Sequence, residues 1–316
     1  MSVVKKGSRI ILSIGRERYC YDESSRPLGE GAMGIVFLGT NMNTGKPVAI
    51  KRVRSNYANI PAIRRRAHTE GDFMFSHDNL VEMYGCCEDV SGRGPVFLVS
   101  GFVQGENIDT FIKQRIRNLP NVERHICNIF MPVLDALGFL HAKGIIHLDI
   151  KPSNIMVERN RNVRLMDLGI AVDSMDTAIM SEMMGTPRYA APEQFANSGY
   201  EKGPTFSADI YEAGVTLYEL ITQKNPFPGT VDEAREMHKT LILPDDPSIS
   251  ESVLAVIRKA TDVNPLKRYQ DASQMKYDLQ NALMSKQKPK PFYVRFWWCA
   301  AAIAGIIIGL LITLTL

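Results

Sequence analysis

The chain lacks the marks of a secreted, zinc-binding or nucleic-acid-binding protein. Its five cysteines are odd in number and show no CxxC spacing, so the sequence predicts neither a disulfide framework nor a zinc site. The formal net charge of +3 is too small to indicate nucleic acid as a partner. Charged residues at 22% and hydrophobic residues at 45% are ordinary for a globular protein. Function therefore has to be inferred from motifs.

A signal peptide and internal repeats are also missing from the sequence. Charged residues interrupt every apolar run in residues 1–20, so the apolar core of a signal peptide is absent. No repeat or low-complexity tract precedes residue 286. We therefore expect most of the chain to lie in the cytoplasm.

Residues 296–316 contain no charged residue at all. As a helix they would reach about 30 Å, the thickness of a bilayer core. A buried core helix is the alternative, but such helices are usually amphipathic and this segment is apolar all round. Residues 286–295 carry basic residues and no acidic one, as expected of a cytoplasmic flank. We predict a basic juxtamembrane linker over 286–295 and a single C-terminal transmembrane helix over 296–316.

Small residues recur every four positions in this apolar segment, which would place them on one helix face. They are Ala301, Gly305, Gly309 and Thr313. Such spacing lets two membrane helices approach closely, which predicts a homodimer through this segment. The alternative is an anchor and nothing more, because glycine and alanine are common in membrane helices.

The remaining pattern divides the chain into two parts. Short strand-like runs broken by turn signals fill the first hundred residues, with one helix beginning at Pro61. After the junction near Gln104 and Gly105, apolar residues recur at three- and four-residue intervals, as in helices. We predict an α+β fold with a small β-rich lobe over 1–103 and a larger α-helical lobe over 104–285. Ligands often bind between two such lobes.

The stretch "GEGAMGIV" places Gly29, Gly31 and Gly34 in a G-x-G-x-x-G-x-V pattern. Glycines let a backbone turn tightly and approach phosphate oxygens closely. A dinucleotide-binding loop has similar spacing, but here the strand-like runs "IVFLG" and "PVAIK" follow instead of a helix. Lys51 ends the second run, at the place where a strand lysine contacts the α- and β-phosphates in kinases.

Two later stretches, "HLDIKPSN" over 147–154 and "MDLG" over 166–169, complete an ordered set of motifs. With "VAIK" and "GTPRYAAPE", they make the chain resemble a eukaryotic-type (Hanks-type) Ser/Thr protein kinase over roughly residues 20–285. The tetrapeptide "APEQ" and the C-terminal anchor are most similar to the bacterial, membrane-anchored branch. The resemblance implies the two-lobed kinase fold, ATP and Mg²⁺ as cofactors, and protein substrates with Ser or Thr.

The resemblance assigns roles to the polar side chains of these motifs. Asp149 would orient the substrate hydroxyl and accept its proton, and Lys151 would contact the γ-phosphate, which favours Ser/Thr specificity. Asn154 and Asp167 would be the Mg²⁺ ligands. Lys51 would pair with a glutamate of the helix that begins at Pro61.

Glu70 is the candidate for that glutamate. Met74, one turn later, would then face the core. A gapless alignment instead places His68 near this position, and a histidine cannot replace the carboxylate. Glu70 therefore stays the predicted partner of Lys51.

The resemblance also implies a set of residues around the nucleotide, with Ser100 at the gatekeeper position. Because serine is small there, we expect bulky adenine analogues to be accommodated. The nucleotide-contacting residues are Leu28, Gly29, Gly31, Gly34, Val36, Ala49, Lys51, Ser100, Gly101, Val103 and Met156.

The resemblance places an activation segment between Asp167 and Glu193, with Thr186 near the substrate site. It gives structural roles to His147, to Asp209 as an anchor of the catalytic loop, and to a Glu193–Arg268 pair. Leu168 stands where phenylalanine is usual, and Leu148 where many kinases carry a phosphate-binding arginine. A leucine cannot bind phosphate, so activity should depend little on phosphorylation of Ser174, Thr177 or Ser181 in the activation segment.

Three functions are compatible with these features. The first is an active, membrane-anchored Ser/Thr kinase that also autophosphorylates. The second is a nucleotide-binding pseudokinase that acts as a scaffold or allosteric partner, suggested by Leu148 and Leu168. The third, a structural adaptor at the membrane, explains the anchor but not the motifs.

Overall fold

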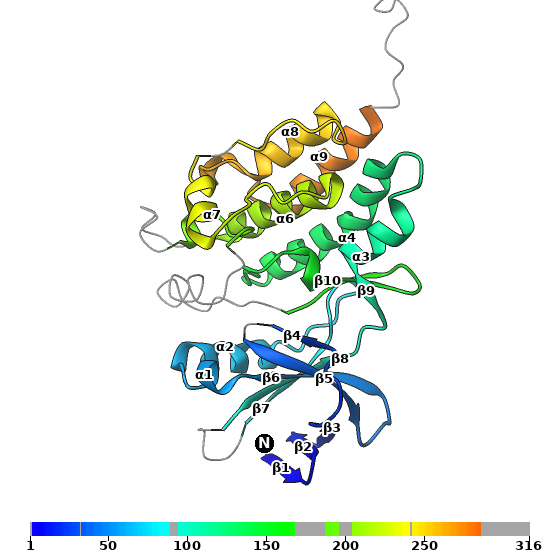
Figure 1. The fold of residues 1–316 in the computed structure, drawn as a ribbon, viewed down its shortest axis with the longest axis vertical. Helices are drawn as coiled ribbons and strands as arrows, with labels where there is room; N and C mark the ends of the chain where they lie inside the picture. The colour runs from blue at the N-terminus through cyan, green and yellow to red at the C-terminus, as the bar shows by residue number, and fades with distance from the viewer. Residues whose placement is uncertain are drawn as a thin grey trace, which may run out of the picture.

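The computed structural model describes residues 2–31, 33–88, 94–167, 187–195, 204–240 and 242–285. Strands dominate the first part of the chain and helices the second (Figure 1). The strands are β1 (Ser2–Lys6), β2 (Arg9–Ile14), β3 (Glu17–Asp22), β4 (Gly29–Glu30), β5 (Gly34–Asn41), β6 (Pro47–Val53), β7 (Met83–Glu88), β8 (Val96–Gly101), β9 (Gly105–Asn107), β10 (Ile155–Glu158) and β11 (Val163–Leu165). The α-helices are α1 (Ser55–Ala58), α2 (Pro61–Asp72), α3 (Ile108–Phe111), α4 (Val122–Ala142), α6 (Phe206–Thr222), α7 (Val231–His238), α8 (Glu251–Ala260) and α9 (Ala272–Ser285).

An antiparallel sheet forms the small lobe, with strand order β1-β2-β3-β5-β6-β8-β7 and β4 paired to β5. Side chains alternate between the two faces of such a sheet. The paired residues Phe37, Ile50 and Val99 point to one face and are buried. Val36 and Lys51 are paired on the opposite face. One face of the sheet is therefore covered by a hydrophobic core, and the other carries Lys51.

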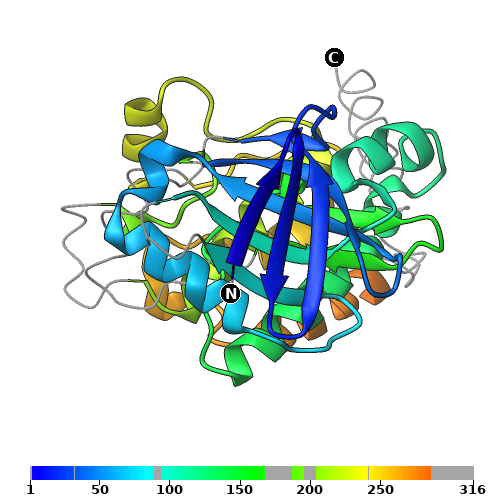
Figure 2. The ribbon, with the colours of Figure 1, turned by 90° about the horizontal axis from the view of Figure 1, so that it is seen from below.

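Strands β1 and β2 form a hairpin that precedes the kinase-like part of the sequence. Its turn at Gly7 and the next turn at Gly15 have φ of 62° and 57°, a conformation that glycine adopts without strain. Leu12 of β2 is fully buried in one cluster with Tyr21 and Phe37, whose rings lie 4.7 Å apart. The N-terminal strands, dark blue in Figure 2, lie across the other strands of the sheet. The hairpin thus covers the face of the sheet that carries Phe37.

Helix α2 begins at Pro61, as predicted, and packs against β7 and β8. A Cβ added to Gly71 would overlap the Cβ of Cys86, so glycine permits this close approach. The helix ends at Asp72, and Met74 beyond it is 74% exposed. The expectation that Met74 faces the core is therefore wrong, because helical periodicity applies only as far as Asp72.

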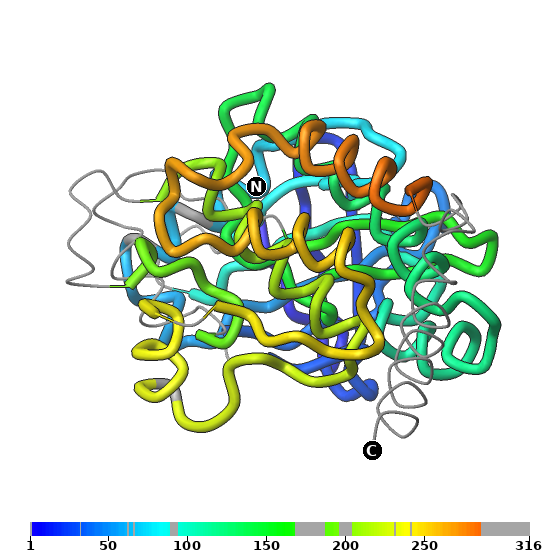
Figure 3. The backbone as a smooth tube through the Cα atoms, turned by 90° about the horizontal axis from the view of Figure 1, so that it is seen from above, coloured from blue at the N-terminus to red at the C-terminus, as the bar shows by residue number. Residues whose placement is uncertain are grey.

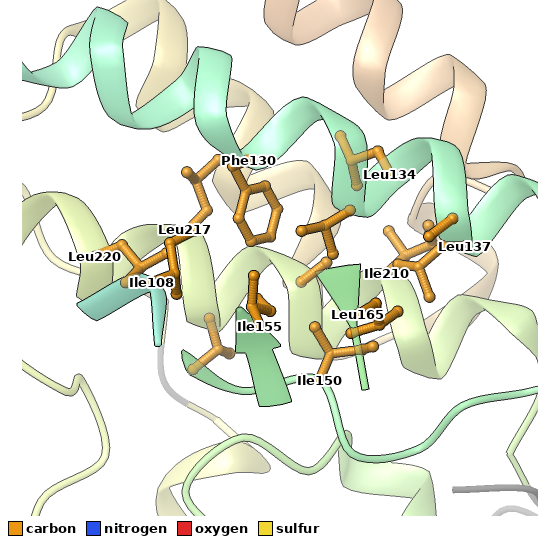
Figure 4. Close-up of a cluster of buried hydrophobic side chains, with 14 of the residues drawn as sticks. Ile108, Phe130, Leu134, Leu137, Ile150, Ile155, Leu165, Ile210, Leu217 and Leu220 are labelled. Atoms are coloured by element: carbon orange, nitrogen blue, oxygen red, sulfur yellow. The ribbon is translucent and has the colours of Figure 1, made fainter. Parts of the chain in front are cut away.

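The large lobe is mainly helical, and α4, α6, α8 and α9 pack on one another (Figure 3). Strands β9, β10 and β11 form a small antiparallel sheet beside them. Figure 4 shows apolar side chains of α4 and α6 meeting those of the strands and of the loop before β10. The fully buried residues among them include Ile108, Phe130, Leu137, Ile150, Ile155, Leu165, Ile210 and Leu217. The predicted two-lobed fold, β-rich and then helical, is confirmed.

One helix in the described part of the chain, α4, is long and apolar enough to cross a membrane. It lies inside the large lobe, and Phe130, Leu134 and Leu137 on its buried face pack in the core. Length and apolarity are explained here by the core. The predicted linker and transmembrane helix, over 286–295 and 296–316, lie outside the described residues.

Candidate active site

Residues 147–154 form a loop between α4 and β10, and helix α6 holds its backbone. The carboxylate of Asp209, fully buried on α6, accepts hydrogen bonds from the backbone N–H groups of His147 and Leu148. His147 N lies 2.9 Å from Asp209 Oδ2, and Leu148 N lies 2.8 Å from Asp209 Oδ1. His141 Nε2 of α4 lies 2.8 Å from the same carboxylate. Asp209 thus contacts the loop as an anchor would.

Leu148 has a left-handed backbone conformation with φ of 58°. For a residue with a large side chain this costs about 1–2 kcal/mol. The hydrogen bond from its N–H to Asp209 holds the conformation, and its side chain packs against the core of the large lobe. The residue between His147 and Asp149 therefore makes an apolar contact.

Asp149 lies between two polar side chains of its own loop. Lys151 Nζ forms an ion pair of 2.7 Å with Asp149 Oδ1. Asn154 Nδ2 donates to Asp149 Oδ2 at 2.7 Å and to the Asp149 carbonyl at 2.9 Å. These contacts orient the carboxylate, and they leave Oδ1 of Asn154 as the oxygen that can coordinate a cation.

A backbone hydrogen bond brings the two predicted metal ligands together. Met166 N donates to Asn154 O at 2.8 Å, so Asp167 follows directly beside Asn154. His147 Nε2 lies 3.1 Å from Met166 O and donates to it, because a carbonyl can only accept. Burial lowers the pKa of His147, whose ring is fully buried and neutral. His147 thus links the catalytic loop to the residue before Asp167.

Lys51 of β6 reaches Asp167 across the two lobes, with Nζ 3.1 Å from Oδ1. Partial burial acts to raise the pKa of Asp167, but the Lys51 ammonium with its hydrogen bond, together with the charge of Lys151, outweighs it, so the pKa lies below its ordinary value. Asp167 is therefore ionised at neutral pH. Its φ of 52° is left-handed, which aspartate tolerates better than most residues.

Asn154 and Asp167 fit Mg²⁺ rather than a transition metal. In the described part of the chain no group of three or more His, Cys, Asp or Glu side chains could hold a metal ion. Mg²⁺ needs no such cage, because it usually takes one or two protein oxygens together with phosphate oxygens and waters. An amide oxygen and an ionised carboxylate side by side provide those protein ligands.

Glu70 and His68 occupy different environments on α2. Glu70 is 6% exposed, whereas the His68 ring lies 3.1 Å from Glu88 Oε1 on β7. His68 is thus engaged with a carboxylate of its own lobe. The contact of Lys51 described above is with Asp167, and a pair between Lys51 and Glu70 stays a prediction.

The glycine pattern forms a tight hairpin between β4 and β5. Gly31 N donates to Gly34 O at 2.9 Å, and Leu28 N donates to Val36 O at 2.8 Å. A Cβ on Gly34 would lie 2.7 Å from the carbonyl oxygen of Arg52, so this position requires glycine. Gly29 and Gly31 have open space at the Cβ position, which leaves their backbone accessible to a ligand.

The predicted nucleotide contacts of the sheet lie on one face. Val36 pairs with Lys51, and Ala49 pairs with Ser100, so these four side chains point the same way. This is the face opposite the N-terminal hairpin. The sequence prediction thus selected residues that the sheet register brings together.

Three other predicted contacts lie where the two lobes join. Gly101 ends β8, and its N–H donates to Glu82 O at 2.8 Å, which leaves its carbonyl as the group that could meet a nucleotide. Val103 is 9% exposed, and Met156 of β10 is half-buried against the core of the large lobe. Their contacts with adenine remain predictions.

The ion pair between Glu193 and Arg268 attaches the end of the activation segment to the large lobe. Arg268 donates to the two carboxylate oxygens of Glu193 at 2.6 and 2.9 Å, and both side chains are buried. Two donors of one guanidinium on one carboxylate make a specific, rigid link. Residues 168–186, with Leu168, the predicted phosphorylation sites and Thr186, lie outside the described residues.

Sequence reasoning missed two side chains of α6 that also hold the catalytic loop. Ile150 N donates to Glu212 Oε2 at 2.7 Å, and Thr216 Oγ1 donates to Ile150 O at 2.9 Å. With Asp209 they lie three and four residues apart on one helix face. That polar spacing in an otherwise apolar helix was the available signal.

Comparisons with known proteins identify the family of this chain. The protein kinase domain family model matches residues 23–279. The chain belongs to the protein kinase family. This kinase chain is 34% identical over 268 residues to the probable serine/threonine-protein kinase PknB of Corynebacterium glutamicum, covering 80% of this chain and 40% of that protein. It is 32% identical over 266 residues to the serine/threonine-protein kinase PrkC of Bacillus subtilis, covering 81% and 40%.

The relatives place this kinase in the bacterial branch of the Hanks type, as the sequence predicted. The chain spans about 40% of the length of these curated relatives. Among solved structures, the kinase domain of Mycobacterium tuberculosis PknI matches with a TM-score of 0.64 and 20% identity, over 90% of this chain and 97% of that one. At that identity the match supports the fold.

Proposed function

We propose that this chain is a Ser/Thr protein kinase that transfers the γ-phosphate of ATP to protein hydroxyls and also autophosphorylates. The observation that carries the proposal is the arrangement of Asp149. Its carboxylate is held between Lys151 and Asn154, and Asn154 lies beside the Lys51–Asp167 ion pair. The names of the bacterial relatives, which are serine/threonine-protein kinases, support the same substrate class.

In this mechanism Asp149 accepts the proton of the substrate hydroxyl while the oxygen of that hydroxyl forms a bond to the γ-phosphorus. The bond between that phosphorus and the bridging oxygen to the β-phosphate breaks, and ADP leaves with the electron pair. Lys51 holds the α- and β-phosphates, and Lys151 balances negative charge on the transferred group. Mg²⁺, held by Asn154 and Asp167, would neutralise phosphate charge. Most of the catalysis is thus positioning and charge neutralisation.

Phosphate transfer can be tested with the full-length chain in a mild detergent. We expect wild type to incorporate labelled γ-phosphate into a basic protein on Ser and Thr. Lys51→Met and Asp167→Ala should each abolish incorporation, because each removes a charge that holds the phosphates or the metal. Substantial activity of Asp167→Ala with Mg²⁺ present would contradict the assignment of Asp167 as a metal ligand.

We also propose that residues 296–316 anchor the kinase in the membrane and pair two copies. The proposal rests on the uncharged segment and on its small residues at every fourth position. Pairing would favour phosphorylation in trans by raising the local concentration of kinase domains. A membrane two-hybrid comparison with the Gly305→Leu, Gly309→Leu double variant tests it, and an equal signal would leave the segment as an anchor only.

A pseudokinase scaffold is not favoured as the alternative. A scaffold has no need of Lys51, Asp149, Asn154 and Asp167 together, yet the chain keeps all four. Leu148, the main argument for it, is explained by its packing against the core. Phosphate transfer by wild type separates the two functions.

A further inference from the structure

Glu212 of α6 is a buried carboxyl group at a junction of three segments. It is 2% exposed and lies between the catalytic loop and the segment 187–195 that ends the activation segment. The mechanism above does not use it. A carboxyl group taken out of water is costly unless its oxygens receive hydrogen bonds, so its partners define what it holds in place.

Both oxygens of Glu212 accept hydrogen bonds, from different segments. Oε2 accepts from Ile150 N at 2.7 Å, the amide between Asp149 and Lys151. Oε1 accepts from Gln194 Nε2 at 3.0 Å. The orientation of that amide is settled by its other end, because Ala191 N donates to Gln194 Oε1 at 2.5 Å. A continuous chain of hydrogen bonds thus runs from Ile150 through Glu212 and Gln194 to Ala191.

The carboxyl group of Glu212 forms no ion pair in the part of the chain that the structure describes. Burial raises the pKa of Glu212 well above its ordinary value, and the nearby charge of Asp209 acts the same way, whereas its N–H donors act against them. An apolar residue at this position would leave the N–H donors of Ile150 and Gln194 without their acceptor, which costs free energy in a buried site. Its presence therefore calls for a role that an apolar side chain cannot fill.

We propose that Glu212 is a positioning residue for phosphoryl transfer. It holds the Ile150 amide, and so Asp149 and Lys151 on either side, in a fixed position relative to the segment 187–195. Thr216 supports the same peptide from one turn further along α6, through the Ile150 carbonyl. The inference rests on the proposed kinase function. The position of Asp149 relative to the segment 187–195 matters only if Asp149 acts on the hydroxyl of a substrate bound beside that segment.

An exchange of the two side chains gives the sharpest test. In Glu212→Gln alone, the new amide has one acceptor oxygen for two N–H donors, so either the Ile150 or the Gln194 contact is lost. In the double variant Glu212→Gln, Gln194→Glu, the amide can accept from Ile150 and donate to the new carboxylate, which can accept from Ala191. All three hydrogen bonds can then form with the carboxyl group moved to the other side chain. Glu251→Gln, at an exposed position at the start of α8, is the matched control.

The variants are measured in the full-length chain for kcat, KM for a peptide, Kd for ATP and thermal midpoint. We expect Glu212→Gln to lower kcat about ten-fold or more through misplacement of Asp149, with Kd for ATP within about two-fold of wild type. The double variant should recover much of that loss, and Glu251→Gln should match wild type. If the role of Glu212 were purely structural, the variant would have a lower thermal midpoint, and kcat and ATP affinity would fall together or not at all. That result would overturn the inference.

Two other results decide against it. An unchanged kcat in folded Glu212→Gln, or a double variant no better than the single one, contradicts the positioning role while wild type remains an active kinase. An inactive wild type would instead overturn the proposed function and this inference with it. If Glu212→Gln does not fold, Gln194→Met serves instead, because it removes the hydrogen bonds of Gln194 to both Glu212 and Ala191 and keeps the contact between Ile150 and Glu212. A loss of kcat in the same direction is expected, and an unchanged kcat there also refutes the role.

Discussion

At the scale of single residues, Leu148 combines a left-handed backbone with an apolar contact. Its φ of 58° is held by the hydrogen bond to Asp209, and its side chain packs on the core of the large lobe. An arginine at this place would present a guanidinium to a phosphate. The apolar side chain of Leu148 cannot form such a contact.

Activity should therefore depend little on phosphorylation of Ser174, Thr177 or Ser181. The triple alanine variant is expected to keep its initial rate within about two-fold of wild type, because the residue before Asp149 is a leucine and cannot bind a phosphate. Peptide phosphorylation by the full-length chain measures this, with circular dichroism as the folding control. Loss of activity in a folded triple variant would show that another cation receives the phosphate.

His238 is a second residue whose environment has a measurable consequence. Its buried ring lies with Nδ1 2.7 Å from the hydroxyl of Tyr211, and it stacks on Phe227 with 3.5 Å between the ring centroids. Burial lowers the pKa of His238 from 6.5 to about 3, and a backbone contact at Pro187 opposes this only in part. The folded protein thus keeps this histidine neutral in mildly acidic solution.

This shift predicts how stability changes with pH. Because the folded pKa lies below the unfolded one, the unfolded state binds the proton first as pH falls. The contribution is complete above about pH 6.5 and is lost by about 1.4 kcal/mol per pH unit below it, down to about pH 3. Urea unfolding of wild type and His238→Phe at pH 7 and pH 5 should therefore show the difference in free energy of unfolding shift by about 2 kcal/mol. Parallel pH profiles would contradict a neutral buried His238.

At the scale of secondary-structure elements, the N-terminal hairpin is part of the small lobe. Strand β2 buries Leu12 against the sheet face that carries Phe37 and Val99. The backbone of the hairpin also meets β7, where Cys87 Sγ donates to Ser2 O at 3.3 Å. The hairpin therefore stabilises the sheet whose other face carries Lys51.

Truncation of one side chain tests this role. Leu12→Ala should lower the free energy of unfolding by about 2–5 kcal/mol, as expected for a fully buried leucine. The control is Leu38→Ala on β5, where the side chain is 46% exposed and a change of about 0.5 kcal/mol or less is expected. Chemical denaturation of both variants provides the values. Equal, small effects would mean that the hairpin is only loosely attached.

Several elements were predictable from the sequence, and the exceptions have physical causes. The glycine hairpin, the start of α2 at Pro61 and the loop 147–154 follow from local turn chemistry and ordered motifs. The end of α2 did not follow, because helix ends depend on packing, and Met74 was misplaced for that reason. The role of Glu212 was not evident either, because its hydrogen bonds join segments far apart in sequence.

At the scale of the whole molecule, the site lies where the two lobes meet. The Lys51–Asp167 ion pair joins β6 of the small lobe to the end of β11 in the large lobe. Residues 79–81 also pair with β11, through Leu165 N to Asn79 O at 2.8 Å and Val81 N to Leu165 O at 3.0 Å. The segment that follows α2 is thus attached to the large lobe. The position of α2, which carries the predicted partner Glu70, therefore depends on contacts with both lobes.

The most direct measurement compares Asp149→Asn with Asp135→Asn in the full-length chain. Asp135 is the matched control, because it is a carboxylate on α4 of the same lobe that pairs with Lys276 at 2.6 Å, away from the loop 147–154. Asp149→Asn should lower kcat by at least about a hundred-fold, the usual effect of removing a general base, while ATP affinity stays within a few-fold. Asp135→Asn should keep kcat close to wild type. An Asp149→Asn variant that retains most of the wild-type kcat would contradict the role of Asp149 as the residue that accepts the substrate proton.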